Sequence, residues 1–150
     1  MLTIRSVVQS NDDSDAKQRC FRLFRYTTFD FGQPSQIPCG PSAATDNATL
    51  CLALPLTNNG TMSGSTVPQL YLQFPPVAHH PTALLKGFNK TKVLAPGEQT
   101  VATFRLTGRD LSWWGPNAAG STGWVRGTAG LTAWFAASSC DRRRALVLTP

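Results

Sequence analysis

The chain has 150 residues, of which 41% are hydrophobic and only 15% are charged, and its formal net charge is +6. A chain of this length forms one domain with a sizeable core, burying roughly 68–70% of its unfolded surface. This apolar content excludes a disordered chain. The chain contains no uninterrupted run of about 18 apolar residues, the length that predicts a membrane span, so we expect no membrane partner.

The first 25 residues differ from the rest of the chain. Residues 10–15 are polar, and residues 16–25 are predicted to form a short basic helix capped by Asp15. From Tyr26 onward the pattern is typical of β-structure. We therefore divide the chain into an N-terminal tail, 1–25, and one domain, 26–150.

The clearest strand signal covers residues 50–56, where leucines alternate with other residues. This period of two buries one face of a strand. Pro55 lacks an amide hydrogen, which predicts an edge strand or a bulge at this position.

Further apolar segments follow at regular spacing. The predicted segments are residues 67–74, 84–88, 91–94, 100–106, 131–136 and 145–148. Residues 95–98 read Ala-Pro-Gly-Glu, which predicts a type II turn with Gly97 at positive φ. Short strands separated by turn signals indicate an all-β fold, specifically a β-sandwich.

The positive charge raises the question of nucleic-acid binding. Residues 142–144 form the only run of arginines. A nucleic-acid-binding module sets its basic residues in a stripe, together with a recognisable fold motif or an aromatic platform, and we find no such motif. We interpret the charge as solvated surface and expect no nucleic-acid partner.

Metal and cofactor chemistry have little support. His79 and His80 are adjacent in a proline-rich loop with no third ligand nearby in sequence, so we expect no metal site. The chain has no nucleotide-binding glycine motif and no nucleophile elbow, and we expect no cofactor.

Four cysteines, Cys20, Cys39, Cys51 and Cys140, form no CxxC motif. They allow three disulfide pairings, among which sequence does not choose. Cys39–Cys51 is the first pairing to test because it closes a short Pro/Gly-rich loop. Four free thiols are the alternative.

Three sequons, at Asn47, Asn59 and Asn89, fit N-glycosylation of a secreted protein. The N-terminal sequence has an apolar stretch that is too short and too broken for a signal peptide. These two observations point in opposite directions about the compartment.

Five segments occur in an order that carries a family resemblance. They are residues 67–72, 85–88, 94–98, 109–114 and 138–141. Their succession resembles the C-terminal fibronectin type III-like domain of glycoside hydrolase family three enzymes. The sequence of residues 67–76 is most similar to that of the secreted fungal β-glucosidases. The resemblance covers residues 24–150 and implies an immunoglobulin/fibronectin type III-like sandwich.

The resemblance implies a non-catalytic module. Enzymes of this family are retaining glycosidases whose two catalytic carboxyl groups lie in domains upstream of this one. We therefore expect the chain to be inactive alone and to pack against the catalytic domains of a β-glucosidase. We interpret Glu98 as a solvated turn acid, and Asp110 and Asp141 as hydrogen-bond acceptors that fix loops.

Two alternatives stay open. A free-standing carbohydrate-binding or adhesion sandwich would bind β-glucan through stacked tryptophans; of Trp113, Trp114, Trp124 and Trp134, we favour Trp113 and Trp114 as contacts. The second alternative is that the reading frame is a truncated gene model, since residues 1–20 have no counterpart in the family. For the parent enzyme we expect an extracellular location.

Overall fold

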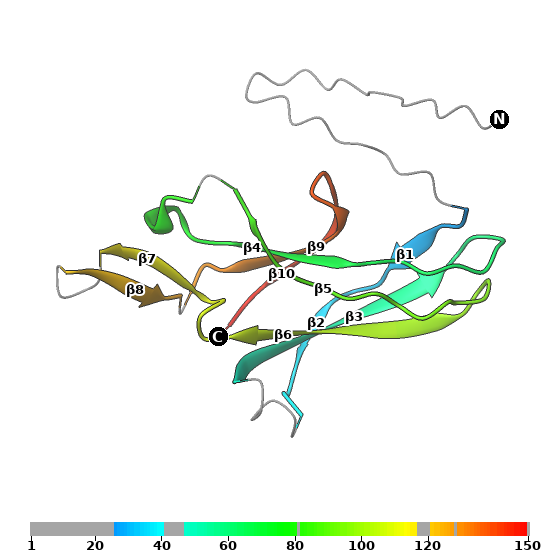
Figure 1. Ribbon diagram of the computed structural model, residues 1–150, viewed down its shortest axis with the longest axis horizontal. Helices are drawn as coiled ribbons and strands as arrows, with labels where there is room; N and C mark the ends of the chain where they lie inside the picture. Colours follow the sequence, from blue (N-terminus) through cyan, green and yellow to red (C-terminus); the bar gives the residue numbers. More distant parts are fainter. Residues whose placement is uncertain (1–25, 41–46, 81, 117–120, 128, 150) are drawn as a thin grey trace, which may run out of the picture.

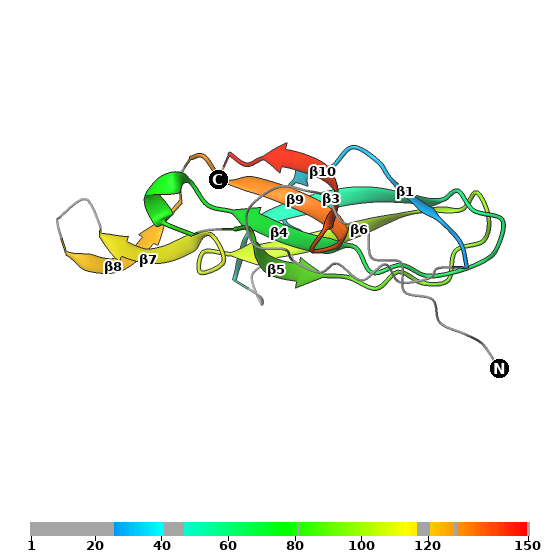
Figure 2. The same ribbon diagram turned by 90° about the horizontal axis from the view of Figure 1, so that it is seen from above.

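The computed structural model describes residues 26–40, 47–80, 82–116, 121–127 and 129–149. In this part of the chain, two antiparallel sheets pack face to face around one core (Figures 1 and 2). The all-β sandwich expected from the sequence is confirmed. The predicted tail, 1–25, with its basic helix, lies outside the described residues. Within them, no helix is long and apolar enough to cross a membrane.

The first sheet is built around one long strand. Its members are β1 (Phe29–Phe31), β2 (Ser35–Ile37), β3 (Ala48–Asn58) and β6 (Gln99–Thr107). Strand β3 pairs with β6 along almost its whole length, while β2 and β1 pair with its first and second halves along the other edge. Strand β3 is therefore central, with neighbours on both sides.

This position corrects one half of the expectation that Pro55 marks an edge strand or a bulge, because β3 is not an edge strand. Pro55 lies opposite Val101 of β6 within an unbroken register. Its carbonyl accepts a hydrogen bond from the Gly32 amide at 2.9 Å, at the point where β1 has ended and β2 has not begun. A residue's N–H and C=O point to the same side of a strand, so the missing amide hydrogen of Pro55 faces this break and costs no ladder bond.

The second sheet has the strand order β10-β9-β4-β5. Its members are β4 (Gln69–Gln73), β5 (Leu84–Phe88), β9 (Thr132–Ser138) and β10 (Asp141–Val147). A short 3-10 helix, η1 (Pro76–Ala78), follows β4. All pairings are antiparallel, which suits a sheet with one buried and one solvated face.

The leucine alternation produces the core. Leu52, Leu54 and Leu56 of β3 have no exposed surface, and they face Leu70 and Leu72 of β4 within one cluster of buried side chains. Burying such a side chain stabilises the fold by about 1.5–3 kcal/mol. The period of two seen in the sequence therefore identified the inner face of both sheets.

The turn at residues 95–98 also forms as predicted. Gly97 has a φ of 78°, and the Glu98 amide donates to the Ala95 carbonyl at 2.9 Å. The segment 91–94 is not a strand, in contrast to the prediction. Leu94 makes only an isolated bridge to Gly64, and its buried side chain explains the apolar signal.

Candidate functional site

A β-hairpin projects beyond one end of the two sheets (Figures 1 and 2). It consists of β7 (Ser112–Pro116) and β8 (Thr122–Arg126), which pair only with each other. Trp113 attaches the hairpin to the sandwich: its side chain is 8% exposed, and its ring meets Phe74 edge-to-face at a centroid distance of 5.8 Å.

The opposite face of the hairpin carries an exposed aromatic cluster of Trp114, Trp124 and Arg109. Trp114 and Trp124 lie directly opposite each other across the strands and are 57% and 50% exposed. Their rings are nearly perpendicular, with centroids 5.5 Å apart. The Arg109 guanidinium lies 3.5 Å from the Trp124 ring centroid, in a cation–π contact that holds both side chains in place.

The structure separates the two tryptophans that the sequence grouped as sugar contacts. Successive residues of a strand point to opposite faces, so Trp113 enters the core and offers no free ring face, whereas Trp114 stays in solvent. Trp124 is the partner that sequence reasoning did not single out. Had the hairpin been predicted, its cross-strand register would have paired Trp114 with Trp124.

A compact turn before β7 positions Arg109. The Asp110 carboxylate accepts hydrogen bonds from the Thr107 amide at 2.9 Å and the Thr107 hydroxyl at 2.7 Å. The Ser112 hydroxyl donates to the Gly108 carbonyl at 2.7 Å. Asp110 thus acts as the acceptor that fixes this loop, and its contacts orient the chain leading into the hairpin.

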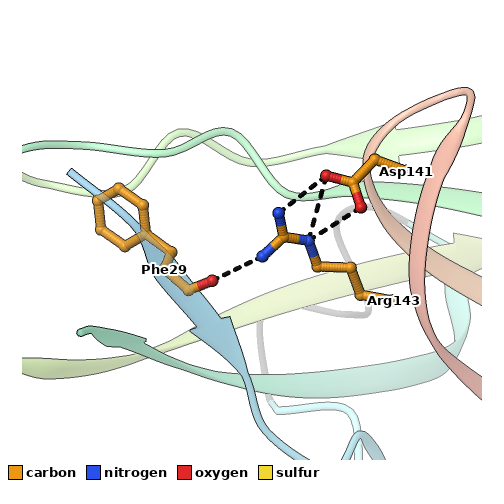
Figure 3. Close-up of polar contacts among 3 residues, drawn as sticks. All are labelled: Phe29, Asp141 and Arg143. Atoms are coloured by element: carbon orange, nitrogen blue, oxygen red, sulfur yellow. Dashed lines mark hydrogen bonds and ion pairs between the residues drawn. The ribbon is translucent and has the colours of Figure 1, made fainter. Parts of the chain in front are cut away.

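A second polar cluster joins the two sheets (Figure 3). Arg143 of β10 donates to the Phe29 carbonyl of β1 at 2.7 Å, and to Asp141 at 3.2 and 2.8 Å. Its guanidinium also lies 5.1 Å from the Phe31 ring centroid. Arg143 therefore has structural partners and is not part of a free basic surface, although it belongs to the arginine run.

The remaining candidate acids and histidines have local contacts. Glu98 pairs with Lys92 at 2.7 Å and accepts from the Ala95 amide at 2.8 Å; the hydrogen bond from Lys92 is the main cause that lowers the pKa of Glu98. His79 has a left-handed backbone after η1, and His80 packs on Phe74. Among the described residues, no three His, Cys, Asp or Glu side chains gather as metal ligands.

The cysteines and sequons have definite places in the fold. Cys39 and Cys51 are joined by a disulfide with a Cα–Cα distance of 5.2 Å, and Cys140 is also disulfide-bonded. The three sequon asparagines, Asn47, Asn59 and Asn89, are exposed. The Asn89 amide donates to the Thr103 carbonyl at 3.3 Å.

Comparison with known families identifies the class of domain. Residues 66–139 match the model of the fibronectin type III-like domain, a range that runs from just before β4 to just after β9. This match confirms, for residues 66–139, the resemblance to a fibronectin type III-like domain that the sequence indicated.

The curated relatives are β-glucosidases. The chain is 34% identical over 102 residues to Probable beta-glucosidase D of Aspergillus niger, and 41% identical over 91 residues to Beta-glucosidase cel3A of Pyricularia oryzae. These matches cover 63% and 59% of this chain, but 13% and 12% of the relatives. The chain thus spans about one eighth of the length of these enzymes.

Solved structures give the same result. The chain is similar to Beta-D-glucoside glucohydrolase from Trichoderma reesei, with a TM-score of 0.67 and 28% identity over 83% of this chain and 19% of that one. Beta-glucosidase D2-BGL from Chaetomella raphigera matches with a TM-score of 0.65 and 32% identity, over the same shares of the two chains.

Proposed function

We propose that this domain is a non-catalytic accessory domain of a glycoside hydrolase family three β-glucosidase, and that it stabilises the catalytic domains by packing against them in the same polypeptide. The observation that carries the proposal is the match to one limited region of several β-glucosidases. The Asp and Glu side chains in the part of the chain that the structure describes support a non-catalytic role, since each of them has a local structural partner. These pairs are Asp30–Arg144, Glu98–Lys92, Asp110–Thr107 and Asp141–Arg143.

The aromatic cluster is the surface best suited to this packing. Trp and Arg are the residue types that most often dominate the binding energy of protein interfaces. Trp114, Trp124 and Arg109 are held in fixed positions by mutual contacts, so docking would cost little side-chain entropy. The projecting hairpin would also reach a neighbouring domain without contact from the rest of the sandwich.

A chimera tests the proposal. Residues 26–150 replace the matching region of Probable beta-glucosidase D of Aspergillus niger, and a second variant has that region deleted. We expect the deletion to inactivate at a lower temperature than the intact enzyme, and the chimera to recover most of the difference. A chimera no more stable than the deletion variant would contradict an accessory role.

Paired substitutions in the chimera then locate the interface. Trp114→Ala with Trp124→Ala should remove the recovered stability. The matched control is Val147→Ala, which truncates an apolar side chain that is 68% exposed on β10. Equal behaviour of the two variants would show that the domain docks through another surface while leaving the accessory role intact.

A carbohydrate-binding sandwich is the second candidate, and the exposed Trp114 ring favours it because aromatic faces suit pyranose rings. Affinity electrophoresis of the isolated chain in soluble β-glucan separates the two functions. Retardation that Trp114→Ala abolishes and Val147→Ala preserves would favour the binder. Unchanged mobility would leave only the accessory role.

We also propose an extracellular location for the parent enzyme, with glycans on the exposed sequons. Disulfides persist in oxidising compartments, which supports this proposal. Secretion from a fungal host, followed by enzymatic removal of N-glycans, should shift the mass of the chain. Substitution of Asn47, Asn59 and Asn89 by Gln should reproduce that shift, and an unshifted chain would contradict glycosylation.

A further inference from the structure

One flank of the sandwich carries an unpaired edge of each sheet. Strand β6 ends the first sheet and β5 ends the second, and in the part of the chain that the structure describes neither outer edge pairs with another strand. The two strands contact each other without forming a ladder (Figure 2). A row of unpaired backbone amides and carbonyls is a template on which another chain can pair, so natural proteins cover or charge such edges.

A cleft of about 420 Å³ lies between these two edges. Gly87 and Phe88 of β5 line it, together with Thr103 of β6 and the buried side chains of Leu70 and Phe104. Phe88 is 71% exposed, so its ring offers apolar surface at the rim. A Cβ at Gly87 would stand 3.4 Å from the Phe104 ring, so the glycine keeps this space open. The cleft therefore combines apolar surface with free backbone groups.

The third sequon lies at the rim of this cleft. Asn89 directly follows β5, lines the cleft and is exposed. Its side-chain Nδ2 donates to the Thr103 carbonyl of β6 at 3.3 Å. The amide and carbonyl of one residue point to the same side of a strand, so the Thr103 amide shares this free edge. The atom to which an N-linked sugar is attached thus lies against the edge of β6.

We propose that an N-linked glycan on Asn89 lies in the cleft between β5 and β6 and covers the free edges of both sheets. This inference rests on the glycosylation proposed above. In the transfer, Asn89 Nδ2 forms a bond to C1 of the first N-acetylglucosamine, and the bond from that C1 to the diphosphate of a lipid-linked oligosaccharide breaks. The lipid diphosphate leaves with the electron pair of that bond, and one Nδ2 proton is released.

The chemistry of the cleft suits this occupant. One Nδ2 proton remains on Asn89 and can keep the hydrogen bond to the Thr103 carbonyl, which holds the first sugar beside β6. The exposed Phe88 ring offers an apolar face on which a pyranose ring can stack. The sugar hydroxyl and N-acetyl groups can bond the free backbone groups of the edge. Because a glycan is bulky and solubilising, it also blocks pairing with another chain.

Site mapping of the full chain, secreted from a fungal host, tests the attachment. Enzymatic release of an N-glycan converts its asparagine to aspartate, which marks each occupied site in the mass spectrum. After this release, trypsin yields residues 87–90, in which Asn89 is the only asparagine. We expect aspartate at this position. Unmodified Asn89 would overturn the inference, whereas aspartate at Asn47 or Asn59 would still support glycosylation of the chain.

Hydrogen exchange followed by NMR tests the position of the sugar. The secreted chain is trimmed to a single N-acetylglucosamine and compared with Asn89→Gln. The Thr103 amide should exchange at least about tenfold more slowly in the trimmed chain, because the sugar removes it from water. Asn59→Gln is the matched control, since Asn59 does not line this cleft, and it should leave the rate unchanged. Equal rates in the trimmed chain and Asn89→Gln would overturn the docking of the sugar.

Sedimentation velocity tests the covering role. We expect Asn89→Gln to self-associate at protein concentrations at which the glycosylated wild type and Asn59→Gln do not. Adding Thr103→Lys to Asn89→Gln should reverse the association, because a lysine on an edge strand opposes pairing. Association that is the same for Asn89→Gln and Asn59→Gln, or that Thr103→Lys leaves unchanged, would overturn the covering of the edges. Neither result would affect the accessory role, which the chimera tests separately.

Discussion

The side chain of Asn58 organises one end of the sandwich. It is fully buried, and all of its hydrogen-bonding capacity is used. Its oxygen accepts from the Thr27 hydroxyl at 2.7 Å and the Gly60 amide at 3.1 Å, and its nitrogen donates to the carbonyls of Met62 at 2.9 Å and Leu94 at 2.8 Å. One amide therefore ties three loops to the end of β3.

We predict that Asn58→Ala lowers the free energy of unfolding by about 2–4 kcal/mol, because it leaves several buried polar groups without partners. Urea denaturation followed by circular dichroism measures the change. Asn59→Ala is the matched control, since Asn59 is exposed and its backbone bond to Thr28 is retained. A loss for Asn58→Ala no larger than the control's would contradict the role given to this amide.

Glu98 gives the fold a pH-dependent contribution. Its pKa is lowered from the ordinary value of 4.5, chiefly by the hydrogen bond from Lys92. A carboxyl group with a depressed folded-state pKa stabilises the fold above its unfolded pKa, and this contribution is lost as pH falls through the folded value. Because the pair is exposed, the effect is small and screened by salt.

We predict that Glu98→Gln lowers the melting temperature at pH 7 and low salt, and that the difference from the wild type disappears as the pH falls through the lowered folded-state pKa of Glu98. Glutamine can still accept from the Ala95 amide, so the variant tests the charge alone. Thermal melts across pH provide the measurement. A difference that persists at low pH would show that the charge is not responsible.

At the residue scale, sequence reasoning succeeded where a local rule decides the outcome. Gly97 takes positive φ because the Pro-Gly turn requires it, and Asp110 fixes its loop through a hydrogen bond three residues away. The roles of Asn58 and Trp124 could not be found in this way. Their partners are far away in sequence, and only the assembled fold brings them together.

At the scale of elements, Arg143 links β10 of one sheet to β1 of the other. The two sheets share no backbone pairing at this point, and a charge-assisted hydrogen bond from Arg143 to the Phe29 carbonyl connects them instead (Figure 3). An ion pair with Asp141 of the same strand holds the Arg143 side chain in position. The adjacent Arg144 reaches Asp30 only at 3.7 Å, and both side chains are largely exposed. The two arginines therefore differ strongly in their expected contributions.

We predict that Arg143→Met destabilises the fold by about 1.5–3 kcal/mol, the range for hydrogen bonds to charged groups. Arg144→Met should cost less than about 1 kcal/mol, as for an exposed ion pair. Arg143→Lys should recover part of the loss, because lysine keeps the charge but not the fork geometry. Chemical denaturation of the three variants ranks them, and equal losses at positions 143 and 144 would disprove the link.

Strands in which apolar residues recur at every second position were predicted from the sequence, and strands without this repeat were not. Leucines recur at every second position of β3, and buried residues alternate with more exposed ones in β4 and β6, so the existence and inner faces of these strands were correctly predicted. The hairpin of β7 and β8 was missed because Trp, Gly and Pro in β7 break that alternation. An edge strand or a bulge was predicted at Pro55, because the break between β1 and β2 is a tertiary feature that the sequence does not show.

At the scale of the whole molecule, both sheets share one core. The cluster of buried side chains includes Leu54 from the first sheet, Leu72 from the second and Trp113 from the hairpin. The sandwich class was predictable because it follows from strand number and turn spacing. The order of strands in each sheet was not predicted, since pairing depends on contacts between distant segments.

A shared core predicts that the hairpin unfolds together with the sandwich, although its strands pair only with each other. Trp114, Trp124 and Trp134 are replaced by Phe, which leaves Trp113 as the only tryptophan. Its fluorescence and the far-UV circular dichroism should then report the same midpoint in urea, as expected for a two-state domain. Because Trp113 is buried against Phe74, the hairpin cannot leave without exposing core surface. An earlier fluorescence transition would mean that the aromatic cluster sits on an element that detaches independently, and a rigid docking surface at Trp114 would then be untenable.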